Sequence, residues 1–278
     1  MLGVIGVVWA AIVLAYLTWQ LVEYRGLVAR LLEWQFARFD SSWPIVTVTA
    51  ILLLLTSPIS LTLLYRLRKA RSDPKVKTYE AALYRSRIMR RFLGWIAGAL
   101  AVCAAVVAAL SLTVGGVSEK PIPVSLADLR KGPKIEGPVV MEGTLQLDRI
   151  GFFEDRLLFS GKRLWVAPVL DPARDDAITL FVEIGKREAG PAERRKFDGI
   201  LRYAAARGEL RTLYRNAGYQ VHEPTYVLFK DLASARSPYL RAAIDLLVAA
   251  LVFLIFCGLQ HRRTRALERR GEPEETKA

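Results

Sequence analysis

Four long runs of apolar residues, separated by polar segments, constrain this chain more than any other feature. The first run covers residues 2–22 without a charged side chain, and the others cover residues 44–65, 92–114 and 242–260. A helix rises 1.5 Å per residue, so about 20 apolar residues cross the ~30 Å hydrocarbon core of a bilayer. We therefore predict four transmembrane helices. The first is expected to be an uncleaved span, because no Lys or Arg precedes it and no small-residue cleavage site follows it.

These runs predict the organisation of the whole chain. We expect a three-helix membrane region, a β-rich domain outside the membrane, a fourth transmembrane helix, and a tail that is first basic and then acidic. The corresponding residues are 1–115, 116–238, 239–260 and 261–278.

The segment between the first two runs, residues 23–43, is amphipathic. If residues 24–39 are helical, one face gathers the apolar side chains, and Arg30 and Glu33 lie away from it. Such a helix is typical of a segment that lies in the membrane interface or packs over a helical bundle. The apolar residues are Leu27, Val28, Leu31, Leu32, Trp34 and Phe39.

The distribution of Lys and Arg predicts the orientation in the membrane. Residues 66–91 hold ten Lys or Arg against two acidic residues, and the tail from residue 261 holds six Lys or Arg. Cytoplasmic loops are enriched in Lys and Arg. With four spans, both basic segments lie on one side. We expect an inner (plasma) membrane protein with cytoplasmic termini and a periplasmic or extracellular domain at residues 116–238.

The net charge of +13 has the same origin. Residues 116–237 hold 20 Lys or Arg and 17 Asp or Glu, so the excess of positive charge lies beside the membrane runs. Nucleic-acid binding therefore loses its main support. Membrane lipid becomes the expected partner of the basic flanks.

The third run contains a stripe of small residues. Small residues on one helical face allow another helix to approach closely, because packing drives association in lipid. We predict a helix-packing face whose partner is either another helix of this chain or another protein. Its residues are Gly94, Gly98, Ala101, Ala105 and Ala108.

The fourth run contains one charged residue, Asp245, in its first turn. Carboxylates inside a membrane are candidate functional groups. Arg241 lies four residues earlier on the same face. We therefore favour an anchor or a salt bridge over a proton relay, and keep Asp245 as a candidate intramembrane polar site.

Within the domain at residues 116–238, apolar residues recur at every second position in several short runs. Alternating apolar residues predict strands, and a 3.6-residue period with Phe197, Ile200 and Leu201 predicts a helix from residue 192 onward. We expect a membrane α-helical protein with an α+β domain, in which one helix covers a small antiparallel sheet or OB-like barrel. The expected strands cover residues 139–147, 151–159, 163–170, 177–184 and 219–230.

Residues that carry enzyme chemistry are scarce. The chain has two His and two Cys, far too few for the usual zinc, haem or Cys–His sites. No nucleophile elbow or phosphate-binding glycine loop occurs. We predict no catalytic residue, no metal and no cofactor. The remaining polar features are Glu154–Asp155 as a solvated strand edge, His222 as a surface residue, and Asp171, Asp175 and Asp176 as a polar loop.

Two arginines suggest contact with an acidic partner or with lipid headgroups. Arg194 and Arg195 open the predicted helix, and a helix N-terminus disfavours cations unless an acidic group faces them. We expect a non-catalytic component or assembly factor of a cell-envelope complex that binds a membrane or extracytoplasmic protein through its outer domain. The alternative is a subunit of a small-solute transporter or channel, which Pro58 and Asp245 allow.

Overall fold

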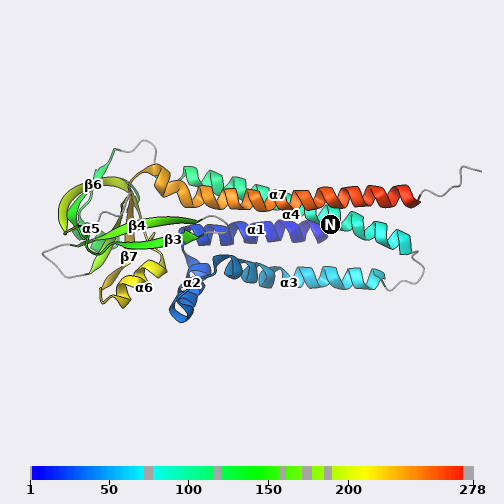
Figure 1. Cartoon of the computed structure of the whole chain (residues 1–278), viewed down its shortest axis with the longest axis horizontal. Coiled ribbons are helices and arrows are strands. Elements are labelled where there is room, and N and C mark those ends of the chain that lie inside the picture. The colour runs from blue at the N-terminus through cyan, green and yellow to red at the C-terminus, as the bar shows by residue number, and fades with distance from the viewer. Residues whose placement is uncertain are drawn as a thin grey trace, which may run out of the picture. The chain divides into compact units, whose positions relative to one another are not determined.

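A computed structural model describes residues 2–71, 78–115, 120–156, 161–170, 177–184 and 190–271 (Figure 1). The chain forms two compact units, each built from segments distant in sequence. We call them the helical unit and the sheet unit. The helical unit contains Met1–Tyr16, Thr49–Val106 and Ala243–Ala278, and the sheet unit contains Leu17–Val48 and Val107–Ala242.

Four long helices come from the four apolar runs. They are α1 (Leu2–Glu23), α3 (Pro44–Arg71), α4 (Thr78–Leu112) and α7 (Leu232–Gly271). Within the described residues, three helical stretches are long and apolar enough to cross a membrane: Gly6–Glu23, Ala82–Leu112 and Leu232–Arg269. These stretches have the length and composition of membrane spans. The described apolar part of α3, Pro44–Ser57, is shorter, so the second span remains a prediction.

Polar side chains join α4 and α7 inside the helical unit. Ser86 Oγ and Thr264 Oγ1 lie 2.8 Å apart, and both side chains are buried. One turn away, Arg87 forms an ion pair of 2.8 Å with Glu268. Cationic residues of the segment 66–91 therefore lie next to the segment that follows residue 260.

The sheet has seven strands in the order β1-β2-β6-β7-β5-β4-β3. The β1–β2 and β5–β7 pairs are parallel, and the other pairs are antiparallel. A short pairing of β2 with β4 also curves the sheet. The sheet is mixed and is not a closed barrel, so the expectation of an antiparallel sheet or OB-like barrel was wrong in its details. The strands are β1 (Ile122–Pro123), β2 (Gly137–Leu145), β3 (Gly151–Arg156), β4 (Gly161–Leu170), β5 (Ile178–Ile184), β6 (Glu193–Arg202) and β7 (Val221–Phe229).

The core of this unit lies between the curved sheet and a short helix, α5 (Leu126–Arg130). Ser125 caps α5 by accepting a hydrogen bond from the backbone N–H of Asp128. Every residue of β5 is buried, and Tyr226 of β7 is buried beside it. The Tyr226 hydroxyl donates to the Pro133 carbonyl at 2.5 Å, which satisfies its polar group.

The segment after residue 192 forms strand β6 rather than the predicted helix. Phe197, Gly199 and Leu201 alternate along one side of β6, and Phe197 and Leu201 are buried. A Cβ on Gly199 would lie 2.3 Å from the Phe229 carbonyl oxygen. Glycine therefore occupies a position where an alternating strand pattern would have an apolar side chain. Without that side chain, the two-residue period of β6 could not be recognised in the sequence.

Two further helices complete the sheet unit. Helix α2 (Gly26–Phe39) buries Val28, Ala29 and Leu32. Leu27, Trp34 and Phe39, which the sequence placed on the same apolar face, are exposed. Helix α6 (Gly208–Asn216) follows β6, and α2 contacts it.

Candidate functional site

A buried ion pair joins the end of α1 to the end of β6. Arg202 Nη2 donates to both carboxylate oxygens of Glu23, at 2.8 Å and 3.0 Å. Both side chains are about one-tenth exposed. Arg25 Nη2 lies 3.7 Å from Glu23 and 3.7 Å from Glu136, and it donates to the Tyr203 carbonyl at 3.4 Å. These five residues therefore connect the α1–α2 turn with the sheet unit.

A second set of charges joins α2 to α6. Arg211 of α6 pairs with Glu33 of α2, and it also lies 3.2 Å from Glu223 of β7. Arg215 donates to Glu223 at 2.8 Å. This hydrogen bond is the main reason why the pKa of the Glu223 carboxyl is lowered. Helix α2 is thus held to the sheet unit by charged groups as well as by its apolar face.

A small cavity lined by both charged and apolar side chains lies beside the Glu23–Arg202 pair. It has about 50 Å³ of space for the centres of water molecules, which is enough for a few waters. Arg207 lies over the ring of Tyr24, with its guanidinium carbon 5.8 Å from the ring centroid. Burial lowers the pKa of Arg207 and raises that of Tyr24. The lining also includes Arg241, Ser237, Pro238 and Tyr239.

Two polar atoms of the residues that line the cavity are not exposed to it. The hydroxyl of Tyr24 and Nε of Arg202 are buried without a hydrogen-bond partner. Neither atom is accessible from the cavity, because both have almost no solvent-accessible surface.

An aromatic pair lies at one edge of the sheet. Phe152 of β3 is 54% exposed, and its ring centroid lies 4.9 Å from that of the half-buried Trp165 of β4. Strand β3 pairs only with β4 among the described residues. Its outer edge is therefore a place where another chain could meet both backbone groups and an aromatic surface.

The predicted small-residue stripe is not the buried face of α4. A Cβ on Gly94 would lie 3.7 Å from Cys257 Sγ of α7, but a Cβ on Gly98 would meet nothing within 4 Å. Ala105 is exposed, and Ala101 and Ala108 are half-buried. The buried apolar residues of α4 are Ala97, Leu100, Cys103, Ala104 and Val107.

The other candidate residues are widely separated. Asp245 is buried within α7, at 2% exposure. Arg194 is 73% exposed in its side chain and pairs with Glu142 at 3.0 Å. Arg195 is half-buried. Since Arg194 and Arg195 lie on β6, the argument from a helix N-terminus was wrong for both.

The remaining polar features form no cluster. Glu154 and Asp155 lie on β3, and His222 is exposed on β7. Asp171, Asp175 and Asp176 lie outside the described residues. Across the described residues, no three His, Cys, Asp or Glu side chains are placed to hold a metal ion.

Sequence reasoning missed the charged groups that join the helices to the sheet. Two signals were present: Glu23 directly ends an uncharged run, and Arg202 interrupts an otherwise apolar stretch at residues 199–206. Neither signal identifies its partner, which is distant in sequence.

Comparison of the chain with protein-family models, with curated proteins and with solved structures gave no match. The function is therefore argued from the chain's own surfaces.

Proposed function

We propose that this chain is a non-catalytic component or assembly factor of a cell-envelope complex, and that it binds a protein partner through the β3 edge of its sheet. The observation that carries the proposal is the exposed ring of Phe152 packed on Trp165. Aromatic residues are enriched at the centres of protein interfaces. A partner strand could also add to the edge by backbone hydrogen bonding.

The charged groups of the sheet unit support this role. The Glu23–Arg202 and Glu33–Arg211 pairs join the sheet to the helical segment 17–39. A domain held in this way presents its edge at a fixed position relative to the end of α1. A fixed binding edge suits a component of an assembly, because its partner must dock in one orientation.

We further propose four spans, with both termini in the cytoplasm of an inner-membrane protein and the sheet outside. The sheet unit contains the end of α1, the start of α3, the end of α4 and the start of α7. This composition agrees with four helices that reach one side of the membrane. The opposite ends include both basic segments, and Arg87 and Glu268 join them. A reporter fused near residue 180 that behaves as cytoplasmic would contradict this orientation.

The partner proposal is tested by purification from native membranes in mild detergent, followed by mass spectrometry. We expect one or more protein partners to co-purify with the native chain in stoichiometric amounts. Phe152→Ser should reduce their recovery at least about tenfold, the equivalent of one central interface residue. The matched control is Leu213→Ser on α6, which is 47% exposed and should retain the partners. Recovery of the native chain alone under several extraction conditions would refute the proposal.

A second candidate function is a subunit of a small-solute transporter or channel. The observation that favours it is the buried carboxyl group of Asp245 in α7. Buried carboxylates in membrane helices often mark ion or proton pathways. In proteoliposomes, Asp245→Asn should then abolish a solute or proton flux without changing membrane insertion.

A further inference from the structure

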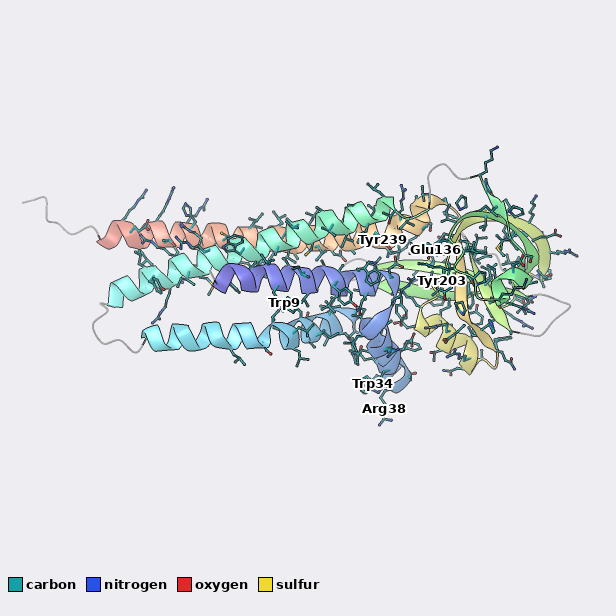
Figure 2. The ribbon with its side chains drawn as sticks, turned by 180° about the vertical axis from the view of Figure 1, so that it is seen from behind. Trp9, Trp34, Arg38, Glu136, Tyr203 and Tyr239 are labelled. Carbon is teal, nitrogen blue, oxygen red and sulfur yellow. The ribbon has the colours of Figure 1, made fainter. Side chains whose placement is uncertain are left out.

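The outer face of α2 combines arginine and aromatic side chains on one stripe. Leu27, Arg30, Trp34, Ala37 and Arg38 are all exposed. At about 100° per residue, these positions fall within roughly one quarter to one third of the helix circumference. Figure 2 shows Trp34 and Arg38 at the outer end of α2, directed away from the sheet. We call these five residues the outer stripe.

Aromatic side chains continue the outer stripe toward α3. The ring centroid of Phe39 lies 5.9 Å from that of Trp34 and 5.6 Å from that of Trp43. The three residues are 59%, 51% and 45% exposed in the order Trp34, Phe39 and Trp43. Tryptophan is enriched where the hydrocarbon core meets the headgroups, because its ring is apolar and its N–H is polar.

The arginines of α2 and its flanking turn differ by the direction they face. Arg25, directed toward the sheet, has the carboxylates of Glu23 and Glu136 nearby. The exposed residues Arg30 and Arg38 have no ion-pair partner among the described residues. The helix's own carboxylate, Glu33, pairs with Arg211 instead, and Asp40 is the one exposed acid at its end. The outer stripe is therefore positively charged.

The position of α2 in the chain places this stripe beside the membrane. Helix α2 starts at Gly26, three residues after the end of the apolar stretch Gly6–Glu23. Three residues of extended chain reach at most about 11 Å, so α2 starts close to the boundary between the hydrocarbon core and the headgroups. Helix α3, whose residues Ile45 and Val46 are exposed and apolar, starts at Pro44 soon after α2 ends.

We propose that the outer stripe of α2 binds the phosphate headgroups of anionic phospholipids, with Trp34, Phe39 and Trp43 inserted at the boundary with the acyl chains. Guanidinium groups pair with phosphate through charge-assisted hydrogen bonds. An amphipathic helix with cations among its aromatic residues is suited to this location. This surface is separate from the β3 edge, and its binding does not depend on a protein partner.

The first experiment measures the depth of α2 in nanodiscs that contain phosphatidylcholine and phosphatidylglycerol. The full chain carries Cys103→Ala and Cys257→Ala, with a nitroxide on Ala37→Cys or, as a control, on Leu213→Cys of α6. We expect the label at 37 to be accessible to oxygen and shielded from a water-soluble nickel chelate, and the label at 213 to be accessible to both. A label at 37 as open to the chelate as that at 213 would overturn the proposal. Shielding from both reagents in every lipid mixture would indicate a protein cover and would also overturn it.

The second experiment measures the phosphatidylglycerol retained by the full-length protein, by native mass spectrometry. Arg30→Gln and Arg38→Gln should each weaken retention about fivefold. The control variants Arg163→Gln and Lys196→Gln remove the same charge from exposed positions on β4 and β6 and should leave retention unchanged. Equal losses in both sets would mean that net charge alone attracts the lipid, which would refute a site on α2. Unchanged retention in Arg30→Gln and Arg38→Gln would refute it as well.

Discussion

Arg202 Nη2 of β6 lies 2.8 Å from Oε1 and 3.0 Å from Oε2 of Glu23, although the two residues are 179 positions apart in the chain. Neither side chain is more than 11% exposed. Each of two charges removed from water to this extent depends on the other, because either one alone would be a buried charge without compensation.

Removal of one partner should therefore be costly. We predict that Glu23→Ala lowers the free energy of unfolding by about 3–5 kcal/mol, because Arg202 becomes a buried charge without its carboxylate. The double variant with Arg202→Ala should lose less than the sum of the two single variants. Denaturant unfolding in mild detergent measures these values.

The control for this prediction is the exposed pair Arg194–Glu142, whose side chains are 73% and 60% exposed. Arg194→Ala should change the free energy of unfolding by less than about 1 kcal/mol. Equal costs for Glu23→Ala and Arg194→Ala would show that burial does not control the effect.

Gly199→Ala should destabilise the sheet strongly. The new Cβ would lie 2.3 Å from the backbone oxygen of Phe229, so β6 or β7 would have to move. We expect a loss of at least about 1–3 kcal/mol in the free energy of unfolding, the usual cost of overpacking. At Gly190 the nearest atom to a new Cβ is Leu147 Cδ1 at 3.8 Å. Gly190→Ala should therefore be nearly neutral, and a similar loss at both positions would contradict this explanation.

Stability should depend on pH through Glu223. The hydrogen bond from Arg215 and the positive charge of Arg211 lower the pKa of its carboxyl group in the folded state. Its contribution is therefore present above the unfolded pKa of about 4.3 and is lost as pH falls through the lower folded pKa. Since the side chain is 57% exposed, we expect less than about 1 kcal/mol. Unfolding midpoints measured from about pH 6 down to about pH 3 should fall less for Glu223→Gln than for the native chain.

The contact between α4 and α7 can be tested by a disulfide. Ser86 Oγ and Thr264 Oγ1 are 2.8 Å apart, so cysteines at these positions should have sulfur atoms close enough to bond. In a background of Cys103→Ala and Cys257→Ala, we predict that Ser86→Cys with Thr264→Cys oxidises readily in membranes. A control with Ser86→Cys and Ala266→Cys should not, because Ala266 is exposed on another side of α7. The readout is a mobility shift on gels that reverses with a reducing agent.

Local patterns predicted most elements of the sheet unit, because they depend on neighbouring residues. Alternation gave the five expected strands, which the structure contains as β2, β3, β4, β5 and β7. The short helix α5 also has a local signal, because Ser125 caps it and Asp128 follows three residues later. The pairing order could not be predicted in this way. It depends on contacts such as the parallel pair Phe181–Val227, between residues far apart in the chain.

The error at β6 has a specific cause. Phe197, Ile200 and Leu201 fit a helical period, whereas the strand period passes through Gly199, which has no side chain to reveal it. The charged groups were missed for a related reason. Glu23 follows an apolar run and Arg202 lies within an apolar stretch. Only the folded chain brings the two residues together.

The division of the chain into two units has a practical consequence for dissecting it into fragments. A fragment that starts after residue 115 and ends before α7 keeps the whole seven-stranded sheet but omits Glu23 and Glu33. Arg202 and Arg211 would then lack the acids they pair with, and the surface that α2 covers would face solvent. A fragment designed to fold as the sheet unit should therefore join residues 17–48 covalently to residues 107–242. Such a fusion restores Glu23, Glu33 and the buried face of α2.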